Sequence, residues 1–401
     1  MRREDTVASK YNYVPEVVGQ AKIADKIIIN DTSTREGEQA SDVSLGVDDK
    51  LTLIRKLAEI GVPQVQGGYP GKSRSDWQLV KRVRNQGLNV KVEAIASLMF
   101  DNWREEVDAC IDSNPDVLGL QYAVSDVRLQ YAHKVTRKEM LARAVEGVRY
   151  ARGRGPTIKF AGTDTTRGDL DFVKEVYSAA VDAGAERIMV ADTTGAMAPS
   201  AMKYFVRAIV DAFDVPVQVH CHNDFGLALA NTLAAVEAGA QIIDVSVNGL
   251  GERAGNASLD EVVVALELFY GLNLGINMQA LKEVSDLMAG LAGVPVPPHK
   301  PLVGENAFAH KLDQHIKWLL INPRLYEPIP PEAVGNRTRI AIGKYTGKFA
   351  IQYKLQQMGL AVSENQIASI KEEIEVAAIR KKAGLSDLDF AEVVQRVCRN
   401  H

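Results

Sequence analysis

Short runs of β-branched and other apolar residues alternate with longer amphipathic stretches, and this alternation constrains the fold more than any other feature. Eight runs have the length of strands: Lys26–Asn30, Pro63–Gly67, Asn89–Ile95, Val117–Tyr122, Thr157–Ala161, Arg187–Ala191, Val217–His222 and Ile242–Asn248. Several of the stretches between them end in glycine, as at Gly61, Gly184 and Gly239, which is typical of helix C-caps. Eight alternating units predict an α/β fold, the TIM (β/α)8 barrel. A doubly wound sheet is the alternative, but no GxGxxG motif follows the first run.

The alternation ends near Gly271, and the chain then changes character. Met278–Leu291 has a helical pattern, and a proline-rich connector follows at Val294–Pro301. We therefore predict an N-terminal arm (1–22), a catalytic barrel (23–271) and a C-terminal, mainly helical region (272–401). A length of 401 residues suits this division, because such a barrel takes up about 250 residues.

Composition and charge exclude several classes of partner. The net charge of −4 gives no basic excess, so nucleic acid is not expected as a partner. The sequence contains no apolar run long enough to span a membrane, and its N-terminus lacks the apolar segment of a signal peptide. The three cysteines form no CxxC pair, which argues against a disulfide framework or a zinc ribbon. We expect a cytoplasmic protein.

The strongest chemical signal is the pair His220 and His222 at the end of the seventh run. Residues two apart on a strand point to the same side, and the chemistry of such barrels takes place where the strands end. Two imidazoles on one side can form half of a site for a divalent metal. The alternative is a pair of hydrogen-bonded histidines in a polar pocket.

Two more segments follow strand runs and carry suitable side chains. After the first run, Glu36 offers a carboxylate oxygen, and Arg35 can neutralise charge that develops on a substrate oxygen. After the eighth run, Asn256 offers an amide oxygen to Mg²⁺ or Mn²⁺. Taken singly, these segments could be a solvated loop with an ion pair and an ordinary glycine-rich turn. Together with the histidines they predict a metal site with open positions for a chelating 2-oxo acid.

These segments resemble the DRE-TIM metallolyases, and in particular their 2-isopropylmalate synthase and homocitrate synthase branch. In the lyase branch the last barrel loop carries a reactive cysteine, whereas here the loop reads GERAGN, which favours the synthases. The matching stretches are DTSTREGEQ at 31–39, ADTTG at 191–195, HCHNDFGLALANTLAAVEAGA at 220–240, NGLGERAGN at 248–256, GENAFAH at 304–310 and GKYTGKFA at 343–350.

The resemblance implies an acyltransferase that condenses acetyl-CoA with a 2-oxo acid in a Claisen-type reaction. It implies a divalent metal (Mg, Mn or Zn) as cofactor, acetyl-CoA as co-substrate and a homodimeric assembly. The implied metal ligands are Glu36, His220 and His222, with Asn256 as a fourth. Arg35 is expected to polarise the keto oxygen. The C-terminal region is expected to deliver a catalytic pair, His315 and Tyr326, often from the neighbouring subunit; taken alone, His315 would be read as a helix-surface histidine.

The substrate pocket departs from the usual family pattern. Homocitrate synthases usually place an arginine after strand four, but Leu129 stands at that position and Arg128 precedes it. Gln66 and Thr163 stand where the family commonly has glutamates. The loss of two carboxylates suggests an unusual 2-oxo acid that bears a further anionic group. The substrate-binding residues expected from the resemblance are Thr193, Arg128, Gln66, Tyr69, Thr163 and Gln39.

Two other functions compete with the synthase. The first is a metal-dependent carbon–carbon lyase or aldolase on the same barrel, and the second is a ligand-binding barrel that no longer catalyses. A barrel without catalysis has no chemical need for all of Arg35, His220, His222 and His315. The chain ends soon after GKYTGKFA, so we expect no leucine-type regulatory domain, and the length fits the shorter homocitrate synthase type.

Overall fold

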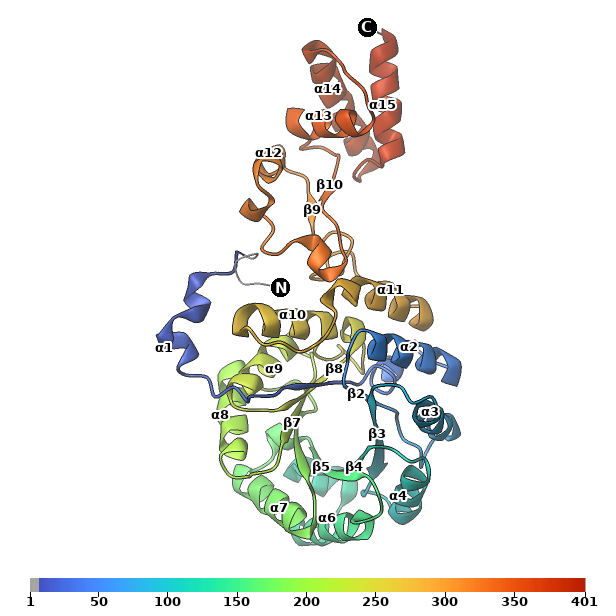
Figure 1. The fold of residues 1–401 in the computed structure, drawn as a ribbon, viewed down its shortest axis with the longest axis vertical. Coiled ribbons are helices and arrows are strands. Elements are labelled where there is room, and N and C mark those ends of the chain that lie inside the picture. Colours follow the sequence, from blue (N-terminus) through green and yellow to red (C-terminus); the bar gives the residue numbers. More distant parts are fainter. Residues whose placement is uncertain (1–6, 401) are drawn as a thin grey trace. The chain divides into compact units, whose positions relative to one another are not determined.

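A computed structural model describes residues 7–400, and their contacts form two compact units. One unit is Lys10–Val296, and the other is the chain from Pro297 onward together with residues 7–9 (Figure 1). Among the described residues, no helix has the length and apolar character that crossing a membrane requires.

The first unit is built on a closed barrel of eight strands in sequence order (Figure 1), so the predicted fold class is confirmed. Each strand pairs in parallel with the next, and β1 closes the barrel against β8. The strands are β1 (Ile28–Asp31), β2 (Gln64–Gln66), β3 (Lys91–Ser97), β4 (Val117–Ala123), β5 (Thr157–Thr163), β6 (Arg187–Asp192), β7 (Val217–Cys221) and β8 (Ile242–Val245).

A ring of helices covers the outside of the barrel (Figure 1). The main helices are α2 (Val47–Glu59), α3 (Arg74–Asn85), α4 (Trp103–Asp112), α6 (Arg137–Ala151), α7 (Leu170–Ala183), α8 (Pro199–Val210), α9 (Ala228–Glu237) and α10 (Leu259–Tyr270). Local sequence sets their ends. At the start of α6, Thr136 and Glu139 cap each other's backbone amides, and Gly184 ends α7 at a φ of 121°.

Shorter elements lie in the loops and flanks of this unit. They are the helices α1 (Pro15–Val18) and α5 (Asp126–Arg128), the π-helical turn η4 (Leu129–His133), and the 3-10 turns η2 (Lys10–Tyr13), η3 (Gly37–Gln39), η5 (Thr165–Arg167) and η6 (Val247–Gly249). The turn η7 (Met278–Ala280) leads into α11 (Leu281–Ala292). By contacts, α1 and α11 group with the barrel. The domain limits predicted from the sequence stay a prediction, and residues 1–6 of the predicted arm lie outside the described residues.

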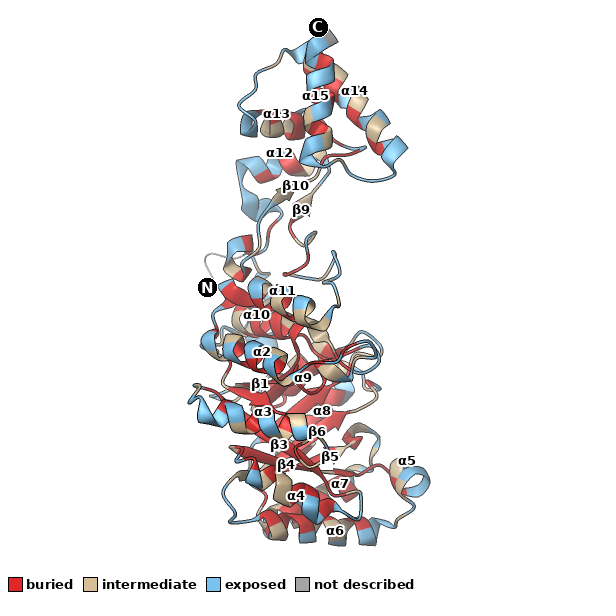
Figure 2. Ribbon diagram, turned by 90° about the vertical axis from the view of Figure 1, so that its right-hand side faces the viewer, coloured by how far each residue is buried: buried red, intermediate tan, exposed pale blue. Residues whose placement is uncertain are grey.

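The barrel has an apolar shell and a polar interior. Buried aliphatic side chains such as Leu53, Leu79 and Val173 lie on the helices of this shell. Figure 2 shows that most of the strands are buried and that the helices around them carry both buried and exposed residues. Polar side chains are also fully buried, among them Asn30, Gln64, Gln66, Glu93, Lys159, Gln218 and Asp244. Buried polar groups are costly unless they pair with one another, so a hydrogen-bonded network is expected there.

The second unit is mainly helical, as predicted. A two-stranded parallel sheet joins β9 (Ala309–His310) and β10 (Arg339–Ile340). The helices are α12 (Asp313–Ile321), α13 (Lys348–Gln357), α14 (Glu364–Lys381) and α15 (Asp387–Asn400), with the 3-10 turns η8 (Pro323–Leu325) and η9 (Pro331–Val334). Their apolar faces share one core, which includes Ile351, Ile370, Ile374, Phe390 and Val394.

Candidate metal centre

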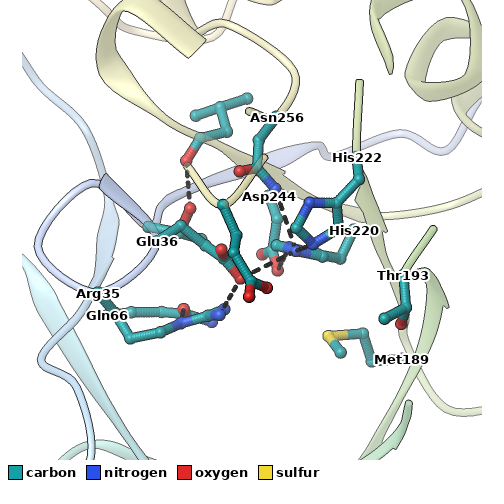
Figure 3. Close-up of polar contacts among 12 residues, drawn as sticks. Arg35, Glu36, Gln66, Met189, Thr193, His220, His222, Asp244 and Asn256 are labelled. Atoms are coloured by element: carbon teal, nitrogen blue, oxygen red, sulfur yellow. Dashed lines mark hydrogen bonds and ion pairs between the residues drawn. The ribbon is translucent and has the colours of Figure 1, made fainter. Parts of the chain in front are cut away.

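Three side chains from two strand ends meet at the carboxyl end of the barrel. Candidate ligand atoms of Glu36, His220 and His222 all lie within 4.8 Å of one another, and all three residues are buried. Figure 3 shows the three side chains turned toward one another. The fold thus gathers the residues that the resemblance names as metal ligands, and their role as ligands stays a prediction.

Strand β7 places the two histidines. His220 lies within the strand and His222 directly follows it, so both side chains face the same side. Their rings meet edge-on with centroids 5.0 Å apart, and the two Nε2 atoms are 3.2 Å apart. Two imidazole nitrogens therefore already stand at the spacing of neighbouring metal ligands.

The turn after β1 brings Glu36 back over the strand end. The backbone amides of Arg35 and Glu36 both donate to the carbonyl of Thr32, at 2.9 and 2.7 Å. Thr32 is itself anchored, because its amide and hydroxyl donate to the carbonyl of Val245 in β8. As a result, Glu36 Oε1 lies 3.2 Å from His220 Nε2.

Asn256 lies on the opposite wall of the cluster, where its backbone bridges to His222. Its Nδ2 is 3.2 Å from His220 Nε2, and its Oδ1 is buried. The backbone of Gly251 passes so close that a Cβ there would stand 1.9 Å from Asn256 Oδ1. Glycine at 251 is therefore what leaves room for the amide.

Asp244 in β8 orients His220 from behind. Its Oδ2 lies 3.0 Å from His220 Nδ1, while its Oδ1 accepts from Asn30 Nδ2 at 2.7 Å and Gln218 Nε2 at 2.6 Å. Burial lowers the pKa of His220 despite the neighbouring carboxylate, so the ring is neutral. A neutral ring that donates Nδ1–H to Asp244 presents the lone pair of Nε2 to the cluster.

The second imidazole is neutral as well. Burial, followed by electrostatic interaction with His220, Arg253 and Arg35, lowers the pKa of His222 to about 2. Metal ions bind the neutral form of histidine, so protons do not compete with a metal at these nitrogens near neutral pH.

Unpartnered polar atoms in the cluster fit a cation. Glu36 Oε2, His222 Nδ1 and Asn256 Oδ1 are buried and have no hydrogen-bond partner. Leaving such atoms unsatisfied costs free energy, which a metal ion bound by the oxygens would offset. Carboxylate, imidazole and amide ligands without a thiolate suit Mg²⁺, Mn²⁺ or Zn²⁺.

Arg35 lies beside the cluster and is held from two sides. Its Nε donates to Gln66 Oε1 at 2.9 Å, and its Nη1 pairs with Glu36 Oε1. Only 8% of the residue is exposed. Figure 3 shows Arg35 and Gln66 on one side of the cluster and Thr193 with Met189 on the other.

Three of the predicted substrate residues lie at or just after the carboxyl ends of barrel strands. Thr193 follows β6, and its hydroxyl accepts from the amide of Asp164 at 2.8 Å. Thr163 ends β5, and its hydroxyl is buried without a partner. The Tyr69 hydroxyl lies 3.5 Å from Gln121 Oε1. Thr163 is therefore free to bond a ligand.

Arg128 and Gln39 are less enclosed. Arg128 is half-buried on α5, and its Nε is 3.6 Å from Asp164 Oδ2. The same Asp164 also accepts from Arg167 at 2.8 Å. Leu129, which stands at the position of the family arginine, is buried. Gln39 is exposed at the end of η3 and is not among the residues of the metal cluster.

The other predicted pair lies in the second unit. His315 is on α12, and its ring stacks on that of Tyr326, with centroids 4.3 Å apart and planes inclined by 28°. Nearby, His310 Nε2 is 3.2 Å from Glu327 Oε1, and the Thr338 hydroxyl donates to the same oxygen at 2.8 Å. The fold brings His315 and Tyr326 together, and their catalytic role stays a prediction.

Three residues with clear roles in the network escaped the sequence analysis: Asp244, Glu93 and Lys159. Asp244 contacts His220, and Glu93 pairs with Lys159 beneath Gln66. A signal for them existed, because each is a charged residue with an apolar residue directly before and after it in a strand run. Such a charge must pair inside the barrel, since charged side chains are rarely buried alone.

Comparisons with known proteins identify the family of the chain. The HMGL-like family model matches residues 26–288, and the model described as "Homocitrate synthase post-HMGL domain-like" matches residues 302–382. The "2-isopropylmalate synthase" of Sulfolobus acidocaldarius is 41% identical over 88% of this chain and 91% of its own. "Homocitrate synthase AksA" of Methanopyrus kandleri is 39% identical over 96% of both chains.

A solved structure shares the fold. The HMG-CoA lyase from Brucella melitensis superposes with a TM-score of 0.59 and 18% identity, over 67% of this chain and all of that one. At that identity the likeness concerns the fold alone. The two family models and the two synthase relatives show the family as well as the fold. This chain belongs to the HMGL-like family, in the branch of the DRE-TIM metallolyases that contains the 2-isopropylmalate and homocitrate synthases.

Proposed function

We propose that this chain condenses acetyl-CoA with a 2-oxo acid, giving a 2-alkylmalate or a homocitrate-like product and CoA. The observation that carries the proposal is the cluster of Glu36, His220 and His222 beside Arg35, with buried ligand atoms that lack partners. The names of the two relatives support it, because each is a synthase of this kind.

Glu36, His220 and His222 would hold a divalent metal, with Asn256 as a further ligand. When bound, the metal supplies Lewis acidity and a template for the two adjacent oxygens of a 2-oxo acid. Arg35 lies beside these ligands with a permanent positive charge. Its guanidinium would stabilise the negative charge that develops on the keto oxygen as the new carbon–carbon bond forms.

The acetyl group needs a base before it can react. We propose that His315, stacked on Tyr326, takes a proton from the acetyl methyl group. The resulting enolate carbon forms a bond to the keto carbon of the 2-oxo acid, and the keto oxygen takes up a proton to become a hydroxyl. Water then cleaves the thioester to a carboxylate and the thiol of CoA, which makes the condensation irreversible.

The 2-oxo acid itself is a finer proposal. Gln66 and Thr163 are uncharged at the ends of β2 and β5, and Arg128 lies nearby on α5. A pocket with these side chains suits a 2-oxo acid that carries a further anionic group. A clear preference for 2-oxoisovalerate would contradict this choice.

The test is the release of CoA from acetyl-CoA with Mg²⁺ or Mn²⁺ present. The acceptors are pyruvate, 2-oxoisovalerate, 2-oxoglutarate, oxaloacetate and phosphonopyruvate. We expect release with one of them, abolished by a chelator and by His222→Ala. If no acceptor supports release but a 2-alkylmalyl thioester is cleaved, the lyase replaces the synthase. If neither reaction occurs with wild-type protein that binds Mn²⁺, the barrel binds ligand without catalysis.

A further inference from the structure

Glu93 is the central acceptor of the hydrogen-bonded network beneath the site. It lies in β3 and has no exposed surface. Its Oε1 accepts from Gln66 Nε2 at 3.4 Å, and its Oε2 accepts from Gln64 Nε2 at 3.3 Å and Asn30 Nδ2 at 3.5 Å. Its Oε1 is also in an ion pair with Lys159 Nζ. Four donors therefore converge on one carboxylate.

The ion pair explains how a carboxylate can be charged at this depth. Lys159 extends from β5 with 1% of its surface exposed, and it reaches Glu93 across the intervening strand β4. It can do so because position 119 on β4 is glycine, where a Cβ would stand 2.9 Å from Glu93 Oε1 and 3.1 Å from Lys159 Cε. A buried carboxylate with a close counterion and full hydrogen bonding remains ionised.

An ionised Glu93 fixes which way the Gln66 amide points. A primary amide has a donor end and an acceptor end, and a carboxylate accepts only. Glu93 therefore takes the NH₂ end of Gln66, so the carbonyl end faces Arg35 and accepts from its Nε at 2.9 Å. With a reversed amide, two donors would face each other beside Arg35 and two acceptors beside Glu93.

We propose that Glu93 is a positioning residue, which holds the Arg35 guanidinium in place by setting the orientation of Gln66. The consequence for turnover rests on the proposed function, in which Arg35 stabilises charge on the keto oxygen. The positioning itself does not, because it concerns a hydrogen bond within the protein. Lys159 takes part as the counterion that keeps Glu93 ionised.

Glu93→Gln is the first variant to compare with wild type. An amide at 93 can either accept from Gln66 or donate to it, so the orientation of Gln66 is no longer fixed. We expect the Arg35 Nε–H, followed by NMR of ¹⁵N-arginine-labelled protein and assigned through Arg35→Lys, to exchange with solvent roughly tenfold faster or more. We expect kcat for CoA release to fall by roughly ten- to a hundredfold, with a smaller change in KM for the 2-oxo acid.

A charge swap without Lys159 supplies the rescue. Glu93 Oε1 contacts both Gln66 and Lys159, whereas Oε2 accepts from Gln64 and Asn30. In Glu93→Gln/Gln66→Glu/Lys159→Met, the amide at 93 can therefore keep its carbonyl toward Gln64 and Asn30 and donate its NH₂ group to the carboxylate at 66, and that carboxylate accepts from Arg35 Nε. We expect slow Arg35 Nε–H exchange to return relative to Glu93→Gln/Lys159→Met. A general loss of packing would not be repaired by a further substitution at a neighbouring strand.

Asp116→Asn is the matched control. Asp116 also accepts a hydrogen bond from β3, from the amide of Val92 at 2.9 Å, but it is not linked to Gln66. Asp116→Asn should lower the stability of the protein without changing the exchange rate of Arg35 Nε–H. If Glu93→Gln does not fold because Lys159 loses its partner, Glu93→Gln/Lys159→Met removes both charges and should show the same fast exchange.

The outcomes separate the two proposals. The positioning role is overturned if Arg35 Nε–H exchange is unchanged in a folded Glu93 variant. It is also overturned if the charge swap does not restore slow exchange. Fast exchange that the swap reverses, in a protein that releases no CoA with any acceptor, supports the positioning role and removes the proposed function instead.

Discussion

Replacing Asp244 by asparagine should weaken metal binding without removing any metal ligand. Asn30 and Gln218 both donate to Asp244 Oδ1, so an amide at 244 must keep its carbonyl oxygen there. Its NH₂ group then faces His220 Nδ1 in place of Oδ2, which accepts at 3.0 Å in the wild type. His220 Nδ1 has to become the acceptor, and the ring proton moves to Nε2, where it points into the cluster.

The size of the expected loss of metal affinity can be taken from similar substitutions in other metal sites. Substitution of the group behind a ligating histidine typically costs about 10- to 100-fold in metal affinity. That range corresponds to about 1.4–2.7 kcal/mol of binding free energy. The loss of folding stability should be smaller, about 1 kcal/mol, because each polar atom of the new amide still has a partner.

Titration of metal-free protein with Mn²⁺, followed calorimetrically at one pH, measures the effect. Asp116→Asn serves as the control, since it removes a carboxylate near the opposite end of the barrel strands. Mn²⁺ affinity of Asp244→Asn within about threefold of wild type would refute the tautomer argument, because a tenfold loss is the least that it allows.

Four further predictions concern the rest of the chain. His315→Ala should reduce CoA release by about 10²-fold or more while Mn²⁺ affinity stays at the wild-type value, and parallel loss of both would contradict a role for His315 as base. Gly251→Ala should displace Asn256 and weaken Mn²⁺ binding about tenfold, which the same titration checks. Burial raises the pKa of Asp31 to about 7, so the folded state keeps a proton that the unfolded chain releases above pH 4. The contribution of Asp31 to the stability of the metal-free protein should therefore fall as pH rises from 4 to 7, by at most about 1.4 kcal/mol per pH unit. The lowered pKa values of His220 and His222 act in the opposite direction but are common to both proteins, so in urea titrations the unfolding free energy of wild type minus that of Asp31→Asn should fall over this range. If the protein is the expected homodimer, light scattering should give about twice the chain mass of 43.8 kDa.

The strands of the barrel were predictable because each carries a strong local signal. The runs ending near Asn30, Tyr122 and His222 all overlap observed strands, since short, largely apolar segments between amphipathic stretches leave little choice of element. The ends of the strands then identified His220 and Glu36, because a closed barrel brings all its carboxyl ends together.

The interior network was not predictable from the same rules. Which donors meet Glu93 depends on the register between strands, and register is set by long-range pairing. The orientation of Gln66 depends in turn on Glu93, which lies 27 residues further along the chain. The stacking of His315 on Tyr326 across η8 is likewise a product of tertiary packing. Residue type alone indicated a polar pocket but not which donor in it bonds which acceptor.

Gly119 links three strands in a way that bears on how this protein can change. Its backbone φ is not in the left-handed region, so glycine is needed there only for the space that it leaves between Glu93 and Lys159. A larger residue at 119 would separate the ion pair and release the orientation of Gln66. Substitutions at positions 93, 119 and 159 should therefore occur together in descendants of this sequence. A redesign of the pocket has to change all three residues at once.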